Sequence, residues 1–131
     1  MSKIKVKIML KDILLIGFGG AVGSILRYLA TLAADALHCA SWFATLSVNG
    51  VGSFLIGLFM SACAEGDWKL MLTVGLCGGF TTYSTFSAQS LEMLRSGNYL
   101  NAGAYILGTV VLCLLFVWAG MFVGTKLGNH I

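Results

Sequence analysis

Ten consecutive residues, 78–87, carry the side chains best suited to chemistry with an ion. They read Gly-Gly-Phe-Thr-Thr-Tyr-Ser-Thr-Phe-Ser and combine two glycines, five Ser or Thr residues and three aromatic residues. Glycine weakens a helix, and Ser and Thr hydroxyls compete for its backbone hydrogen bonds. Inside a membrane, an interrupted helix is tolerated only where the freed polar groups face protein, water or an ion. The stretch therefore predicts a broken membrane helix that lines a pathway.

Two kinds of ion would suit such a break. Carbonyl oxygens released by an unwound turn can hold a cation such as sodium. Tyr83 and Phe86 fall on one face after the break, and the edges of aromatic rings carry partial positive charge that suits an anion. The alternative is that the two rings only pack against neighbouring helices. The glycine and hydroxyl residues around them favour the pathway.

Polar residues in three other segments add to this pathway. A row of small and polar residues at every fourth position lies along one helix face: Thr45, Asn49, Ser53, Gly57 and Ser61. Asn49 is its strongest member, because a buried amide needs hydrogen-bond partners, either as interhelical glue or as a donor to an ion. A second such row comprises Tyr105, Thr109 and Cys113. Arg27 lies deep in an apolar segment, where it either snorkels to the surface or attracts anions at a vestibule.

The elements that carry these residues are four apolar segments: 13–34, 42–64, 70–94 and 99–123. Each reaches the length of roughly 20 residues that a membrane-spanning helix needs. The 131 residues are 58% hydrophobic and only 10% charged, whereas soluble domains carry about 25% charged residues. We therefore predict an all-α integral membrane protein with a single four-helix membrane domain over residues 1–131, its third helix broken near the middle.

The distribution of basic residues predicts the orientation. Four spans place both termini on one side, together with six lysines: Lys3, Lys5, Lys7, Lys11, Lys69 and Lys126. The positive-inside rule then favours cytoplasmic termini in a multi-pass protein of the plasma (inner) membrane. The first apolar run is too long for a cleaved signal peptide and contains Arg27, so we interpret it as a span.

Several function classes are excluded or disfavoured. No Asp or Glu lies in the interior of a predicted span, which argues against a proton-coupled exporter of organic cations. His38 and His130 fall in a loop and at the C-terminus, so no catalytic constellation is visible and we predict no enzyme. The four cysteines lack the spacing of a metal site or a disulfide framework. The net charge of +3 does not indicate a nucleic-acid partner.

Glycines at close-packing spacing predict how the helices associate. Gly19 and Gly23 form one pair four residues apart, and a second series comprises Gly120, Gly124 and Gly128. Small residues at this spacing let two helices approach closely. Because four thin helices do not readily enclose an ion path alone, we expect chains to assemble through these glycine-rich faces.

With these residues in view, the chain resembles the Fluc (CrcB-type) family of fluoride channels. The resemblance rests on the ten-residue motif at 78–87, on Thr-Leu-Ser-Val-Asn at 45–49 and on Arg27, and it covers all four predicted spans. It implies a passive fluoride channel in which two chains form an antiparallel, dual-topology homodimer in the lipid bilayer. It also implies two pores per dimer and a structural sodium ion (Na+) at the dimer centre.

The resemblance assigns roles to individual residues. The backbone carbonyls of Gly78 and Thr81 would hold the sodium ion. The fluoride pathway would comprise Arg27, Asn49, Tyr83, Ser84, Thr85, Phe86 and Tyr105.

Four positions depart from the family pattern. Tyr83 stands where the family usually has Phe, and its hydroxyl adds a donor; Gln89 stands where many members have an acid; Cys113 and Val117 replace polar residues. The lysine-rich N-terminus also fits uneasily with an evenly mixed topology. Two alternative functions stay open: a small multidrug or metabolite transporter, and a non-conducting membrane assembly subunit.

Overall fold

The computed structural model describes residues 2–129, so Met1 and residues 130–131 of the predicted domain, including His130, lie outside the described residues. Its helices are α1 (Lys3–Ala36), α2 (Ser41–Ala62), α3 (Asp67–Leu70), α4 (Gly78–Phe80), α5 (Tyr83–Arg95) and α6 (Tyr99–Gly128). A π-helical segment, η1 (Met71–Cys77), joins α3 to α4. No strand occurs between residues 2 and 129, which confirms the all-α prediction.

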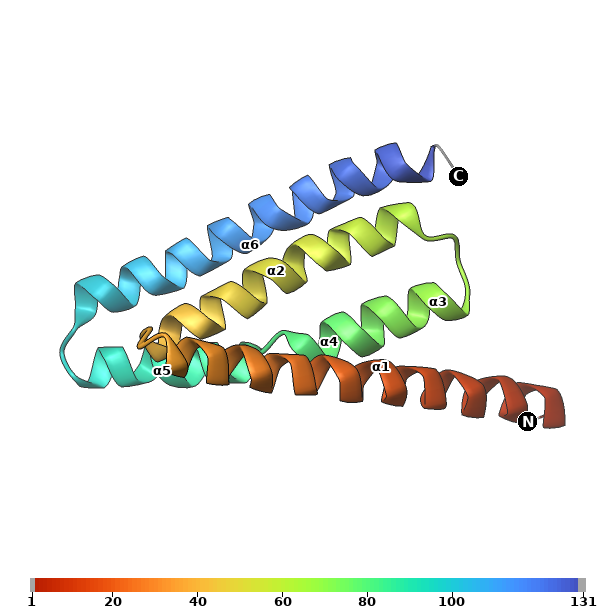
Figure 1. Cartoon of the computed structure of the whole chain (residues 1–131), viewed down its shortest axis with the longest axis horizontal. Helices are drawn as coiled ribbons and strands as arrows, with labels where there is room; N and C mark the ends of the chain where they lie inside the picture. Colours follow the sequence, from red (N-terminus) through yellow and green to blue (C-terminus); the bar gives the residue numbers. More distant parts are fainter. Residues whose placement is uncertain (1, 130–131) are drawn as a thin grey trace.

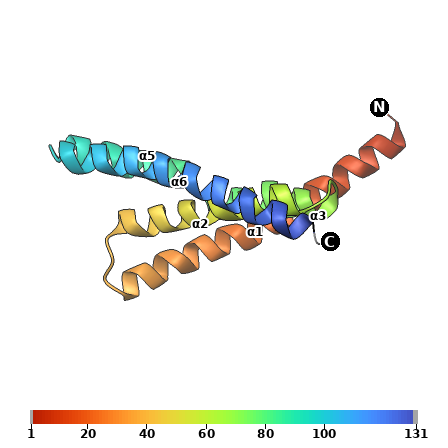
Figure 2. The same cartoon turned by 90° about the horizontal axis from the view of Figure 1, so that it is seen from above.

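The long helices run side by side along the long axis of the molecule (Figure 1). The α3–α5 series forms an interrupted rod beside α1, and the two chain ends lie at the same end of the molecule. Seen from above, α1 and α2 diverge from the α5–α6 pair toward the end opposite to the termini (Figure 2). At the end opposite to the termini, the helices therefore form two separate pairs, α1–α2 and α5–α6. The break in the α3–α5 series lies between this end and the end that carries the termini.

Among residues 2–129, three helices are long and apolar enough to cross a membrane: α1, α2 and α6. α1 begins at Lys3, well before the predicted span, because the Ser2 side chain accepts a hydrogen bond from the backbone N–H of Lys5 and caps the helix. Lysine is also a good helix former, so the lysine-rich segment continues the helix although it is not apolar. The segment predicted as the third span is not one helix but the series α3, η1, α4 and α5.

The predicted break in this segment is confirmed, but it lies after the glycines. Gly78, Gly79 and Phe80 are helical, whereas Thr81 and Thr82 are extended, with ψ angles of 160° and 108°. Phe80 is the last residue of α4 and therefore lies before the break. Glycine makes a helix easier to interrupt, but the position of the interruption depends on what replaces the lost backbone bonds.

The glycine-rich helix faces are covered by other helices of the same chain. A Cβ atom at Gly19 or Gly23 would overlap backbone atoms of η1 and α4, so α1 touches this segment backbone to backbone. Gly57, Gly120 and Gly124 make the same kind of approach between α2 and α6. The expectation that chains assemble through these faces is therefore wrong for these residues, and any partner must use another surface.

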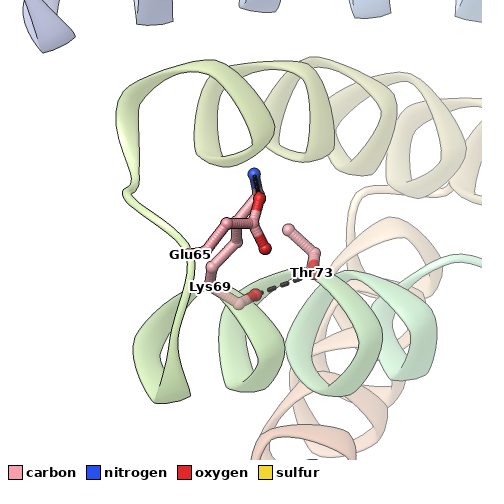
Figure 3. Close-up of polar contacts among 3 residues, drawn as sticks. All are labelled: Glu65, Lys69 and Thr73. Carbon is pink, nitrogen blue, oxygen red and sulfur yellow. Dashed lines mark hydrogen bonds and ion pairs between the residues drawn. The ribbon is translucent and has the colours of Figure 1, made fainter.

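Polar contacts tie the elements together at the end that carries the termini. Lys11 of α1 pairs with Asp67 of α3, with 2.7 Å between Nζ and Oδ1. Lys69 pairs with Glu65, and its backbone carbonyl accepts a hydrogen bond of 2.7 Å from the Thr73 hydroxyl (Figure 3). Ion pairs at an exposed surface contribute little to stability, so these contacts orient the segments around α3 more than they stabilise the fold.

Candidate functional site

The side chain of Asn49 replaces the backbone bonds lost at the break. Its Oδ1 accepts a hydrogen bond of 2.7 Å from the N–H of Thr82, and its Nδ2 donates one of 3.0 Å to the carbonyl of Thr82. Both residues are buried, with exposures of 9% for Asn49 and 7% for Thr82. Buried backbone groups need partners, so the amide from α2 supplies both bonds that the extended backbone gives up.

The hydroxyl of Thr82 then starts the next helix. It accepts a hydrogen bond of 3.3 Å from the N–H of Thr85 and donates one of 2.9 Å to the Thr85 hydroxyl. This is the N-cap arrangement that Ser and Thr favour. Residues 78–87 therefore contain both the end of α4 and the start of α5. Some of their hydroxyl groups form hydrogen bonds within this turn.

The break leaves backbone groups of both kinds free. Within residues 2–129, no backbone N–H donates a hydrogen bond to the carbonyl of Gly78 or Thr81. On the other side, the N–H groups of Tyr83 and Ser84 open α5 and have no partner in its helical ladder. Free carbonyl oxygens attract a cation, whereas a helix N-terminus attracts an anion. The same short turn can therefore serve ions of opposite charge.

Four aromatic rings from three helices lie in a row beside the break. The ring centroids are 5.8 Å apart for Tyr83 and Phe86, 5.2 Å for Phe86 and Tyr105, and 6.1 Å for Tyr105 and Trp42. The prediction that Tyr83 and Phe86 share a face is confirmed by their contact. Phe86 is buried at 7% exposure, whereas Tyr83 is 80% exposed, so one ring lies inside the chain and the other at its surface.

Gln89 fixes the third ring of this row. Its Oε1 accepts a hydrogen bond of 2.8 Å from the hydroxyl of Tyr105, which connects α5 to α6. The sequence marked Gln89 only as a departure from the family pattern. The contact was not predictable from helical spacing, because it joins two separate helices.

One cavity of about 500 Å³ gathers much of the predicted set. Residues from α2, the interrupted segment and α6 line it together: Asn49, Ser53, Gly78, Thr81, Tyr83, Phe86, Thr109 and Cys113, among others. We call this cavity the central groove. None of its lining residues is acidic or basic, so polar contact inside it comes from amide, hydroxyl, thiol and backbone groups.

Arg27 lies apart from this groove. It lines a separate cavity of about 130 Å³ with hydroxyl residues of α1, α2 and the break: Ser24, Thr31, Thr45, Thr82 and Thr85. Arg27 and Thr85 therefore line the cavity that includes Thr82, whereas Thr81 lines the central groove. Ser84 is exposed and lines neither of the two cavities.

The donor set at the break limits which cation it could hold. Among residues 2–129 there is no group of three or more His, Cys, Asp or Glu side chains placed to bind a metal, and the four cysteines are free. The free carbonyls of Gly78 and Thr81 are oxygen ligands without charge. Such a set suits a monovalent ion better than a divalent one, which usually recruits carboxylates.

Comparison with known proteins finds a matching family and related sequences. The sequence matches the family model described as CrcB-like protein, Camphor Resistance (CrcB), over residues 14–121. A relative from Phocaeicola vulgatus is 45% identical over 118 residues, which cover 86% of this chain and 98% of the relative. Relatives from Paramagnetospirillum magneticum and Campylobacter jejuni are 40% and 42% identical over 119 and 120 residues, covering 85% and 88% of this chain and 93% and 98% of theirs.

All three relatives are named Fluoride-specific ion channel FluC. The matched residues include α2, the break, α5 and most of α1 and α6. Together with the three span-length helices, the match makes this a multi-pass membrane protein. The chain belongs to the CrcB-like family.

Proposed function

We propose that this protein is a passive, fluoride-selective ion channel that lets fluoride leave the cytoplasm across the plasma (inner) membrane. The observation that carries the proposal is the central groove at the break, lined by Asn49, Phe86 and Thr109 in a chain whose relatives are named fluoride channels. Fluoride is small and tightly hydrated. A pathway must therefore replace its water with donors that bind weakly enough to release it.

The groove supplies donors of this kind. The Asn49 amide has a second N–H besides the one bonded to Thr82, and the Phe86 ring edge carries partial positive charge. No carboxylate lines the groove, so an anion meets no like charge there. A proton-coupled exporter of organic cations would need such a carboxylate, which is why we favour a channel over the small multidrug or metabolite transporter.

Efflux from liposomes that contain only the purified protein tests this function. With a fluoride gradient and a potassium carrier to balance charge, fluoride should leave without a proton gradient, because the pathway is passive. The non-conducting assembly subunit would give no release beyond that of empty liposomes. Release that depends on an imposed proton gradient would instead support a coupled transporter.

A second copy of the chain would complete this site. Tyr83 lines the central groove but is 80% exposed in the single chain, and the groove is open to the outside. The free backbone groups of a break are unfavourable where they face lipid tails, and Tyr83 lies beside this break. We propose the antiparallel homodimer that the family resemblance implies, with two pores, joined on the face that carries Tyr83 and the groove.

Cross-linking between native cysteines tests the antiparallel arrangement. Cys39 follows α1 at the end opposite to the termini, and Cys63 follows α2 at the end that carries them. We expect chains that keep only Cys39 to cross-link to chains that keep only Cys63. Because the two membrane surfaces lie about 30 Å apart, a short reagent should not join Cys39 to Cys39. Cys39–Cys39 links as the main product would contradict this arrangement.

We further propose that sodium binds between the two chains at the free carbonyls of Gly78 and Thr81. One chain offers two such oxygens, and a second chain related by two-fold symmetry would offer two more. Bound there, the ion would stabilise the two breaks against each other without taking part in fluoride transfer. The lysine-rich end of α1 favours one orientation over the other, so we expect the two topologies to be populated unequally.

An experimental structure of the dimer in sodium-containing buffer checks the cation. We expect an ion within oxygen-ligand distance of both carbonyls, and fewer dimers when sodium is replaced by a larger cation. Water alone at this position, or equal dimer yield without sodium, would count against the site.

A further inference from the structure

We propose that the N-terminal part of α1, residues 3–11, is a docking surface for the headgroups of anionic phospholipids. We call these residues the basic extension. α1 contains 34 residues, so at a rise of about 1.5 Å per residue it is about 50 Å long. The hydrocarbon core of a bilayer is only about 30 Å thick. Both views show the N-terminal end of α1 reaching past α3 and the other helices (Figure 1 and Figure 2). The basic extension therefore reaches the headgroup layer.

The basic extension carries a high positive charge. It contains four lysines and no acidic residue: Lys3, Lys5, Lys7 and Lys11. Three of them, at every fourth position from Lys3, share one face of the helix. Within residues 2–129, the only ion pair made by any of the four joins Lys11 to Asp67. The ammonium groups of Lys3, Lys5 and Lys7 are therefore available to bind phosphate groups, as basic segments beside membrane spans do.

Apolar side chains between the lysines favour a membrane surface over a soluble acidic partner. Ile4, Ile8 and Leu10 are 73%, 52% and 54% exposed, and the first buried residue of α1 is Gly19. At a membrane surface, such side chains contact the acyl chains while the lysine ammonium groups reach the headgroups. A nucleic acid or an acidic protein would neutralise the lysines but would leave the apolar side chains in water. The pattern therefore fits a lipid whose headgroup is anionic.

Two other lysines at the same end of the molecule provide a contrast. Lys69 pairs with Glu65, and the Nζ atom of Lys126 lies 4.3 Å from the centroid of the Phe122 ring. Each of these ammonium groups has a partner within the chain. They are therefore less available to a lipid phosphate than the lysines of the basic extension, and they serve as matched controls.

Lipid binding by the purified full-length chain tests this surface without measuring transport. The protein in a neutral detergent is mixed with phosphatidylglycerol or with phosphatidylcholine that has the same acyl chains, and native mass spectrometry counts the lipids bound. The wild type should bind phosphatidylglycerol in preference. The double variant Lys3→Gln, Lys7→Gln should lower the affinity for phosphatidylglycerol by about tenfold or more, because each lysine near an anionic surface contributes a factor of about five.

Three comparisons separate docking from a loss of structure or of net charge. Glutamine is a good helix former, so the variant should keep the wild-type affinity for phosphatidylcholine. The double variant Lys3→Arg, Lys7→Arg keeps the charge and should bind phosphatidylglycerol as the wild type does. The double variant Lys69→Gln, Lys126→Gln removes the same charge at the same end and should lose less than about twofold.

Three results would overturn the docking surface. The first is equal binding of the two lipids by the wild type, which would leave a soluble acidic partner as the occupant. The second is an unchanged affinity for phosphatidylglycerol in Lys3→Gln, Lys7→Gln. The third is an equal loss in Lys69→Gln, Lys126→Gln, because phosphatidylglycerol would then respond to net charge alone.

Discussion

Asn49→Ala is expected to reduce fluoride efflux by about tenfold to a hundredfold. The change removes the amide that bonds both backbone groups of Thr82 and takes a donor away from the central groove. One donor lost to an ion in a buried site costs about 1–3 kcal/mol, and every 1.4 kcal/mol is a factor of about ten in rate. The amide bonds to the backbone at the break and also lines the groove. Its loss should therefore change the conformation of the break and remove a hydrogen-bond donor from the pathway.

Initial efflux rates and melting temperatures of the two proteins measure this effect. Val51→Ala is the matched control, because Val51 lies on the same helix, is 50% exposed and does not line the central groove. It should keep the wild-type efflux rate. We expect Asn49→Ala to lower the melting temperature as well as the rate, since Thr82 loses two hydrogen bonds. A wild-type rate in Asn49→Ala would mean that fluoride takes another path.

Phe86→Ile is expected to slow fluoride efflux by up to about tenfold while dimers still form. The Phe86 ring lies between the rings of Tyr83 and Tyr105 and is buried beside the groove. Isoleucine fills much of the space but has no polarised edge to offer an anion. Electrostatic contacts of an aromatic ring are worth about 0.5–1.5 kcal/mol, and the upper value corresponds to about tenfold in rate.

Phe122→Ile provides the control for a lost ring. Phe122 stacks on Trp118 near the C-terminal end of α6 and does not line the central groove. The same efflux assay should therefore find it close to the wild type. If Phe86→Ile conducts fluoride as fast as Phe122→Ile does, Phe86 only packs and its ring takes no part in the pathway.

The sequence predicted those features that depend on residues close together along the chain. The all-helical fold and the break in the third apolar segment follow from apolar length and from one dense run of glycine, hydroxyl and aromatic residues. The contact between Tyr83 and Phe86 follows from helical spacing, because residues three apart share a face.

The features that it did not predict depend on contacts between distant segments. Asn49 and Thr82 are 33 residues apart, and their pairing moves the break past Gly78 and Gly79. Gly23 was expected to face a second chain, but it packs against the interrupted segment of its own chain. Spacing along a helix shows which residues share a face, but it does not show what covers that face.

The predicted pathway residues do not all lie in one place. Asn49 and Phe86 line the central groove, whereas Arg27 and Thr85 line the smaller cavity that includes Thr82. Helical spacing could not separate them, because the residues come from different helices. Arg27 shares its cavity with Thr82 and Thr85, which lie at the N-terminus of α5.

Efflux of fluoride and of chloride, measured side by side from liposomes that contain only this protein, tests the central claim most directly. The account predicts fast release of fluoride and retention of chloride. The groove offers small, fixed donors and no cationic side chain, so it should admit the smaller anion and exclude the larger one. Equal release of the two anions, or no release of fluoride, would contradict a fluoride-selective channel formed by this chain alone.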